Sequence, residues 1–274
     1  MNKVYIYLSG GLGNNLFQIS LGLILKKRYS CNVTFLSASK NVNTLLLKGI
    51  FKNDIKIINN PFLYQSYFLN AIFRFLEFIG IFKNDLRITS NELICNYRSF
   101  PNLLIISGYW QDNFHIQEVK DLLCSYFDRH KSYNETPSLD FNSVCVHYRL
   151  GDYLQDKQLN ICNHEYYLNA LKLINFNFKS KVYLFTNNGA DLSNLKLPFT
   201  NFIIIDNNTC SDLISFQLMR RFNTIIIPNS TFSFWAAFLN CHHLTSKFVI
   251  APKLWKKNVD GRDLNYVPST WISI

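Results

Sequence analysis

Short apolar runs alternate with amphipathic stretches along most of the chain. Runs rich in Val, Ile, Leu and aromatic residues predict buried β-strands, whereas apolar residues spaced three and four positions apart predict helices. The predicted strands are Val4–Leu8, Val33–Leu36, Leu104–Ser107, Val144–Arg149, Val182–Thr186, Phe202–Ile205, Thr224–Ile227 and Phe248–Ala251. The predicted helices are Asn15–Tyr29, Glu165–Ile174, Asp212–Arg221 and Phe232–Cys241.

This alternation predicts an α/β fold in which parallel sheets carry helices on both faces. A polar segment, Lys131–Asp140, contains Pro137 and interrupts the pattern. A chain of 274 residues can form one large domain or two smaller ones. We therefore expect two Rossmann-like domains, at residues 1–135 and 136–274.

The composition excludes a disordered chain and favours an anionic partner. Hydrophobic residues make up 48% of the chain and charged residues only 17%. The net charge of +10 suits a phosphorylated substrate, a nucleic acid or an acidic membrane surface. Because the chain has neither a long Lys/Arg block nor a nucleic-acid-binding signature, we do not expect it to bind nucleic acid.

The cysteines predict a reducing compartment. There are seven of them, widely spaced and without a CxxC pair, so free thiols are expected. Cys162-Asn163-His164 and Cys241-His242-His243 each lack the second ligand pair of a zinc site, and no metal is expected.

Two apolar segments bear on localisation. Residues 1–8 run into Ser9-Gly10 without the apolar region of a signal peptide and read as a first strand. The segment Phe62–Phe82 is interrupted by polar residues such as Arg74 and Glu77, which suits a core helix or an amphipathic helix on a membrane surface. We expect a cytoplasmic protein with peripheral contact to the inner face of the plasma membrane.

The segment Val144–Tyr153 carries the most concentrated polar chemistry. It reads as a strand that delivers His147, Arg149 and Asp152 to its carboxyl end, where open α/β sheets bind ligands. An arginine cannot shed its charge, so Arg149 should face an anion or a carboxylate. Two interpretations stand side by side: an Arg149–Asp152 ion pair within a turn, or a ligand site.

A glycine-rich segment, Ser9–Gln18, follows the first predicted strand. Gly11 and Gly13 would let backbone N–H groups approach a phosphate at the start of the next helix. Leu16 stands where a dinucleotide fingerprint needs its third glycine, which disfavours an NAD-dependent oxidoreductase. The plainer interpretation is a tight turn between strand and helix.

Polar residues also follow the strand Leu104–Ser107. Trp110, Gln111 and Asp112 suit a sugar, because an aromatic face stacks on the ring while amide and carboxylate groups bind hydroxyls. The alternative is a buried tryptophan beside a capping aspartate.

A further polar turn lies in Ile225–Trp235. Asn229 or Ser230 can cap the next helix, and the hydroxyls of Ser230 and Thr231 with the first helical N–H groups would form an anion site. Asp212, at the start of the preceding helix, is either its N-cap or a contact to a base or sugar. Polar turns at strand ends in both halves suit a nucleotide sugar held between two sheets that face each other across a cleft.

Four ordered motifs resemble glycosyltransferase family 11, the bacterial α-1,2-fucosyltransferases. Gly10–Gln18 is similar to the family's GGLGNQMFQ, and His147–Tyr153 to its HxRRGDY. Asn229–Trp235 resembles the segment NSSFSWWGAWL, and Ile250–Trp255 resembles the closing APKxW.

The resemblance implies a GT-B fold and an inverting, metal-independent transfer of L-fucose from GDP-β-L-fucose. It also implies an acceptor with a terminal β-galactoside, carried on a lipid during O-antigen synthesis, whose 2-hydroxyl takes the fucose. Arg149 would bind the donor diphosphate and stabilise the leaving-group charge. The other implied donor contacts are His147, Asp212, Ser230, Thr231, Gly11, Gly13 and Asn14, with Trp110, Gln111 and Asp112 on the acceptor side.

The sequence departs from the family pattern at several positions. Leu150 replaces the family's second arginine, and Phe185–Asn188 replaces FSDD with the loss of two carboxylates. Asp152 and Asp112 remain candidates for the general base, and Asp152 could equally orient Arg149. These departures leave a second hypothesis, a non-catalytic nucleotide-sugar or glycan-binding module on the same scaffold.

Overall fold

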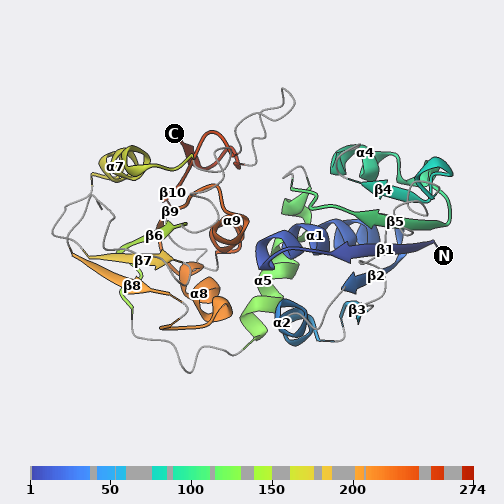
Figure 1. Cartoon of the computed structure of the whole chain (residues 1–274), viewed down its shortest axis with the longest axis horizontal. Coiled ribbons are helices and arrows are strands. Elements are labelled where there is room, and N and C mark those ends of the chain that lie inside the picture. Colours follow the sequence, from blue (N-terminus) through green and yellow to red (C-terminus); the bar gives the residue numbers. More distant parts are fainter. Residues whose placement is uncertain are drawn as a thin grey trace, which may run out of the picture. The chain divides into compact units, whose positions relative to one another are not determined.

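The chain divides into two compact units, Met1–His130 and Lys131–Ile274 (Figure 1). The computed structural model describes residues 2–37, 42–52, 54–59, 76–84, 89–111, 115–130, 139–149, 161–175, 181–186, 201–206, 208–240, 248–255 and 267–274. The predicted boundary after residue 135 lies outside these described residues.

The first unit is built on a parallel sheet with the strand order β3-β2-β1-β5-β4. Its strands are β1 (Lys3–Leu8), β2 (Asn32–Ser37), β3 (Lys56–Asn59), β4 (Phe82–Asn84) and β5 (Leu103–Ser107). Its helices are α1 (Leu12–Tyr29), α2 (Val42–Phe51), α4 (Ser90–Cys95) and α5 (Lys120–Arg129), with short 3₁₀ helices η2 (Tyr97–Ser99) and η3 (Ile116–Val119).

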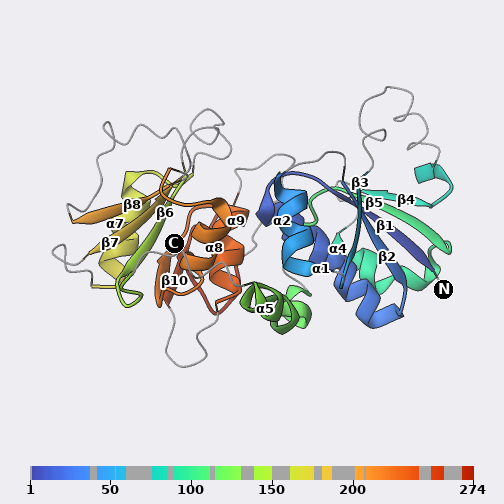
Figure 2. The same ribbon diagram turned by 90° about the horizontal axis from the view of Figure 1, so that it is seen from below.

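The second unit has a parallel sheet with the order β11-β10-β9-β6-β7-β8, of which Figure 2 labels β6, β7, β8 and β10. Its strands are β6 (Val144–Tyr148), β7 (Val182–Thr186), β8 (Phe202–Ile205), β9 (Thr224–Ile226), β10 (Phe248–Ala251) and β11 (Ile272–Ser273). Its helices are α7 (His164–Leu173), α8 (Asp212–Met219) and α9 (Thr231–Phe238).

Helices cover both faces of the second sheet. Consecutive side chains of a strand point to opposite faces. Tyr148 of β6 stacks on Tyr167 of α7, with ring centroids 4.5 Å apart, whereas the neighbouring His147 lies 6.0 Å from the ring of Phe232 in α9. Because Phe216 of α8 also packs on Phe232, α8 and α9 share the face opposite α7.

The predicted α/β class with parallel sheets is confirmed, and all eight predicted strands are present. The structure differs at element boundaries: α1 begins at Leu12 rather than Asn15, and Arg149 lies one residue beyond β6. Helix α1 begins early because Gly11 serves as its N-cap and Gly13 fits within its first turn. The strands that the pattern missed, β3, β4 and β11, are short edge strands with few apolar residues to mark them.

Close packing of α1 on the sheet depends on Gly22. A Cβ atom there would lie 2.6 Å from the Phe35 ring of β2 and 3.0 Å from Ile6 of β1. Both neighbours are buried, with at most 1% of their surface exposed, so neither can move aside easily. The glycine therefore sets how closely the helix approaches β1 and β2.

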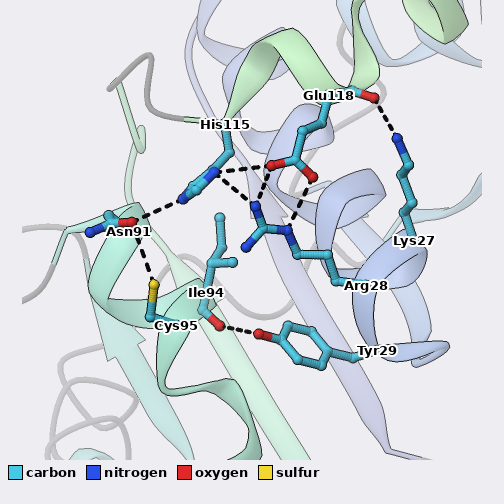
Figure 3. Close-up of polar contacts among 8 residues, drawn as sticks. All are labelled: Lys27, Arg28, Tyr29, Asn91, Ile94, Cys95, His115 and Glu118. Atoms are coloured by element: carbon cyan, nitrogen blue, oxygen red, sulfur yellow. Dashed lines mark hydrogen bonds and ion pairs between the residues drawn. The ribbon is translucent and has the colours of Figure 1, made fainter.

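The last turn of α1 is joined to α4 and η3 by a surface network (Figure 3). Arg28 forms an ion pair with Glu118, and Lys27 donates a 2.9 Å hydrogen bond to the Glu118 carbonyl. The Arg28 guanidinium lowers the pKa of the Glu118 carboxyl. The hydroxyl of Tyr29 donates to the Ile94 carbonyl at 2.5 Å. Because α1 runs back from the carboxyl end of β1, this network lies toward the amino ends of the strands and serves to hold the unit together.

Among the described residues, no helix is both long enough and apolar enough to cross a bilayer. Most of the predicted amphipathic segment Phe62–Phe82 lies outside the described residues, which cover only its end from residue 76.

The packing at Gly22 predicts that Gly22→Ala destabilises the first unit. Overpacking costs about 1–3 kcal/mol, and the higher helix propensity of alanine offsets up to about 1 kcal/mol. We expect a lower unfolding midpoint in urea. Gly49→Ala in α2 is the matched control, because its Cβ would lie 3.5 Å from His130 in ordinary contact. Equal midpoints for the two variants would contradict this account of the helix–sheet contact.

Candidate functional site

The order of strands in the second sheet places its switch point between β6 and β9. From β6 the chain adds β7 and β8 on one side, then returns to add β9 on the other. Open parallel sheets bind ligands outside the carboxyl ends of the two strands that flank such a reversal. Arg149 directly follows β6, and the polar turn Pro228–Thr231 follows β9.

The first sheet repeats this arrangement between β1 and β5. The chain adds β2 and β3 on one side of β1 and later places β5 on the other. The glycine-rich segment follows β1, and Gly108–Gln111 follows β5. The four polar segments singled out in the sequence thus lie in pairs, each pair at the switch point of one sheet.

Burial keeps His147 neutral beside a permanent positive charge. The side chain is 4% exposed, and burial, followed by the charge of Arg149, lowers its pKa to about 3. Its buried Nδ1 has no hydrogen-bond partner among the described residues. At neutral pH, His147 can therefore offer a hydrogen bond but no second positive charge, and Arg149 is the cation that follows this strand.

The start of α9 is formed by buried polar residues. Ser230 holds the N-cap position, yet its side chain makes no capping hydrogen bond. Its N–H donates to the Pro228 carbonyl at 2.7 Å, and its own carbonyl accepts from the Ser233 hydroxyl at 3.2 Å. The Asn229 amide instead donates to the Trp255 carbonyl at 2.9 Å. Of the two capping residues proposed from the sequence, Ser230 occupies the N-cap position, although its side chain forms no capping hydrogen bond.

The other end of α9 is held by a buried arginine. Arg220 is fully buried; its Nε donates to the Leu239 carbonyl at 2.8 Å and its Nη1 to Gln217 at 2.6 Å. A cation at a helix C-terminus interacts favourably with the helix dipole and satisfies a terminal carbonyl. This contact fixes α9, and with it the turn that bears Ser230 and Thr231.

Asp212 is not the N-cap of α8. Ser211 takes that position, and its hydroxyl accepts a 3.4 Å hydrogen bond from the Ile214 N–H. Asp212 is the exposed first residue of the helix, at the carboxyl end of β8 and two strands away from β6. The capping interpretation is therefore wrong, and the contact to a ligand remains a prediction.

Gln18 connects the two strand ends at the switch point of the first unit. This fully buried side chain accepts hydrogen bonds from the Ser9 N–H and from Asn15, and donates to the Gly108 carbonyl at 2.8 Å. Gly10 has φ +77°, and a Cβ there would lie 2.4 Å from Asn14. The glycine-rich segment is thus a tight turn whose shape is fixed by side chains of α1. Gly11 caps that helix, and Gly13 and Asn14 lie in its first turn.

The exposed aromatic after β5 is Tyr109, not Trp110. Trp110 is 3% exposed, whereas Tyr109 is 45% exposed and a carbon of its ring would lie 3.1 Å from a Cβ at Gly10. The Gln111 side chain donates a 2.8 Å hydrogen bond to the side-chain oxygen Oδ1 of Asn14. Of the two interpretations of Trp110, the buried side chain is confirmed, and among the described residues that follow β5 the exposed ring is that of Tyr109.

Several predicted residues lie outside the described part of the chain. They include both candidate bases and the position where the family's second arginine is replaced: Asp112, Asp152 and Leu150. The sequence reading missed Tyr109, and it did not identify the tyrosines of α7 that contact the strand ends. In the sequence, two adjacent tyrosines in an amphipathic helix indicate only that the helix packs on the core, and they do not reveal which groups their hydroxyls bind.

A cavity of about 210 Å³ in the second unit lies beside the start of α7. Residues lining it include Asn163, Glu165, Asn169 and Pro252. None of the predicted donor contacts lines it. Within the described residues, no group of three His, Cys, Asp or Glu side chains is placed to hold a metal ion.

Two curated relatives from Escherichia coli match over almost their full lengths. An alpha-1,2-colitosyltransferase is 26% identical, covering 100% of this chain and 99% of the relative. The O-antigen biosynthesis glycosyltransferase WbnK is 23% identical, covering 92% and 94%.

The fold is also found in solved glycosyltransferases. The E. coli heptosyltransferase WaaC with ADP aligns with a TM-score of 0.51 at 9% identity, covering 99% of this chain and 92% of that one. Together with the two parallel-sheet units, this likeness identifies the GT-B fold class. The family model "Glycosyl transferase family 11" matches residues 2–272. The chain therefore belongs to glycosyltransferase family 11.

Proposed function

We propose that this glycosyltransferase moves L-fucose from GDP-β-L-fucose to the 2-hydroxyl of a terminal β-galactoside, with inversion. The observation that carries the proposal is the pair of motif segments at the β6–β9 switch point: Arg149 directly follows β6, and Ser230-Thr231 follow β9. The likeness to an α-1,2-colitosyltransferase supports an α-1,2 linkage and a related deoxysugar. The likeness to an O-antigen glycosyltransferase supports a surface glycan, carried on a lipid, as the natural acceptor.

Arg149 is the proposed catalytic residue. As the bond from C1 to the donor phosphate breaks, the sugar becomes oxocarbenium-like and the β-phosphate gains negative charge. A fixed guanidinium stabilises that charge more than it stabilises the ground state. The neighbouring His147 is neutral because of its burial, so we assign it a hydrogen bond to the nucleotide rather than a share of the charge.

The remaining donor contacts are proposed from their positions at strand ends. The start of α9, with the hydroxyls of Ser230 and Thr231, would bind phosphate oxygens. Asp212, exposed at the carboxyl end of β8, would pair with guanine. Gly11, Gly13 and Asn14, after β1 in the first unit, stay predictions from the resemblance to the family. We propose that the guanidinium and the helix start supply the charge stabilisation, so that no divalent metal is required.

We propose the acceptor side at the β1–β5 switch point of the first unit. Tyr109 offers an exposed ring, and Gln111 with Asn14 offers an amide pair beside it. A galactose ring stacks on an aromatic face while its hydroxyls bind amides. Tyr109 thereby takes the role that the sequence suggested for Trp110. Asp152 and Asp112 remain the proposed candidates for the base that takes the acceptor proton.

The assignment predicts turnover with GDP-L-fucose and lactose. We expect GDP release together with a fucosylated product whose new linkage is α, measured by mass spectrometry and NMR, and equal rates with and without EDTA. GDP-colitose, whose sugar is the 3-deoxy counterpart of L-fucose, is the comparison donor.

Each outcome separates the alternatives. A preference for GDP-colitose would replace fucose in the proposal. Binding of the donor without release of GDP would support the non-catalytic module. A rate that falls on chelation would contradict the metal-free mechanism.

Arg149→Ala should lower kcat by about 10²–10³-fold, the effect of removing one transition-state donor. Arg149→Lys should recover only part of that rate, because an ammonium lacks the planar fork of donors. Arg221→Ala is the matched control, since Arg221 lies over the Phe141 ring near the amino end of β6. An Arg149→Ala enzyme within a few-fold of wild type would show that the catalytic assignment is wrong.

Tyr109→Ala should raise the KM for the acceptor about tenfold and leave the KM for the donor unchanged, because it removes a stacking face. Tyr109→Phe keeps the ring and should remain close to wild type. Steady-state kinetics with each substrate varied in turn provides the measurement. A rise in the donor KM instead would move Tyr109 to the donor side.

A further inference from the structure

The hydrogen-bonded ladder between β6 and β9 ends where the polar segments begin. The last paired residues of the two strands are Val146 and Ile226. Beyond this pair, β6 stays paired with β7 as far as Tyr148 but is no longer paired with β9. The first residues after the separation are His147 and Ile227. A buried carbonyl in this position needs a new hydrogen-bond partner.

Two consecutive tyrosines of α7 supply those partners. The Tyr166 hydroxyl donates to the Ile227 carbonyl at 2.5 Å, and the Tyr167 hydroxyl donates to the His147 carbonyl at 3.2 Å. Each carbonyl belongs to the first residue beyond the β6–β9 ladder: His147 follows the last pair on the β6 side, and Ile227 follows it on the β9 side. One turn of one helix therefore binds both strand ends.

The surroundings keep both hydroxyls as donors. Tyr166 is 9% exposed and Tyr167 is 1% exposed. Burial raises the pKa of each hydroxyl well above its ordinary value, so both stay protonated throughout the physiological range. Tyr167 is also held between two rings, since it stacks on Tyr148 and packs edge-on against Tyr166.

A third contact from the same stretch reaches the same turn. The Cys162 thiol, just before α7, lies 3.8 Å from the side-chain oxygen Oδ1 of Asn229 and is oriented to donate a hydrogen bond to it. Burial raises its pKa to about 12, so the group is a protonated thiol rather than a reactive thiolate. Cys162, Tyr166 and Tyr167 thus bind backbone or side-chain oxygens within three residues of Ser230 or Arg149.

Core packing alone does not account for the hydroxyls. Both rings belong to the apolar cluster on the α7 face of the sheet, where phenylalanine would fill the same space. A phenylalanine would leave the Ile227 or His147 carbonyl without this hydrogen bond. The hydroxyls therefore fix the geometry of the strand ends, whereas the rings contribute to the stability of the core.

We propose that Tyr166 and Tyr167 are positioning residues for the donor site, which hold the carboxyl ends of β9 and β6 so that Ser230-Thr231 and Arg149 face one ligand. This inference rests on the proposed function, because it assumes that the donor binds at this switch point.

The test replaces each hydroxyl and leaves the ring: Tyr166→Phe, Tyr167→Phe and the double variant. Hydrogen exchange of residues 225–232 and 144–149 is measured first, without ligand. We expect exchange about tenfold faster at the strand end that each tyrosine binds, and no change at the other end of the sheet. Kinetics then compares kcat with the KM for GDP-fucose, and we expect kcat/KM to fall about tenfold for each hydroxyl.

Tyr183→Phe is the matched control. Tyr183 is equally buried in β7, and its hydroxyl accepts a 3.1 Å hydrogen bond from the Asp140 N–H near the amino ends of the strands. It should lower thermal stability by a similar amount and leave kcat/KM within about twofold.

The outcomes separate this inference from the function on which it rests. Unchanged exchange at the strand ends would overturn the inference whether or not the wild type turns over GDP-fucose. Faster exchange with unchanged kcat/KM, in an active enzyme, would also overturn it, because the contacts would then be structural only. If the wild type were inactive with GDP-fucose but exchange were faster in the variants, the tyrosines would be shown to fix the strand ends. The donor assigned to the site would then be wrong.

Discussion

Where two parallel strands separate, the backbone groups that leave the ladder must find other partners, and in this protein buried side chains provide them. In the second unit, the hydroxyls of Tyr166 and Tyr167 in α7 bind the Ile227 and His147 carbonyls, the first beyond the β6–β9 ladder. In the first unit, Gln18 bridges Ser9 and Gly108 after β1 and β5. A gap between strands is a place where a ligand can approach backbone and helix starts, but only if its edges are rigid. These side chains satisfy the backbone and keep those edges fixed.

The electrostatics of the proposed donor site follow from the same burial. His147 loses its charge because it is buried and because Arg149 lies close. Arg149 cannot lose its own charge, so it is the cation that remains at this strand end at neutral pH. The start of α9 adds the partial positive charge of a helix N-terminus. Arg220 completes the support from the other end by binding the last carbonyl of that helix.

Much of the fold could be predicted from the sequence because the central strands are strongly apolar and end in distinct polar turns. β7, β8 and β10 have the predicted bounds, since polar residues flank β7 and β8, and Lys247 and Pro252 flank β10. Edge strands such as β3 and β11 could not be predicted, because they bury few side chains and leave no clear apolar signal. The sequence also located the four polar segments, since a turn after a buried strand is visible without knowledge of the topology.

Tertiary partners could not be predicted in this way. Trp110 is buried and Tyr109 exposed in a segment with a positive φ at Gly108 and at Trp110, a backbone course that the pattern of apolar residues does not reveal. Ser211 rather than Asp212 caps α8, a difference of one residue that patterns do not resolve. The contacts of Tyr166 and Tyr167 depend on where β6 and β9 separate, which requires the sheet order.

The central claim is that GDP-fucose binds at the β6–β9 switch point, and hydrogen exchange with and without the donor tests it most directly. The account predicts slower exchange in residues 144–149 and 227–235 when GDP-fucose is present. It predicts no change at Asn91–Cys95 and His115–Glu118, which belong to the surface network of the first unit. Protection confined to other segments, with residues 144–149 and 227–235 unchanged, would contradict it.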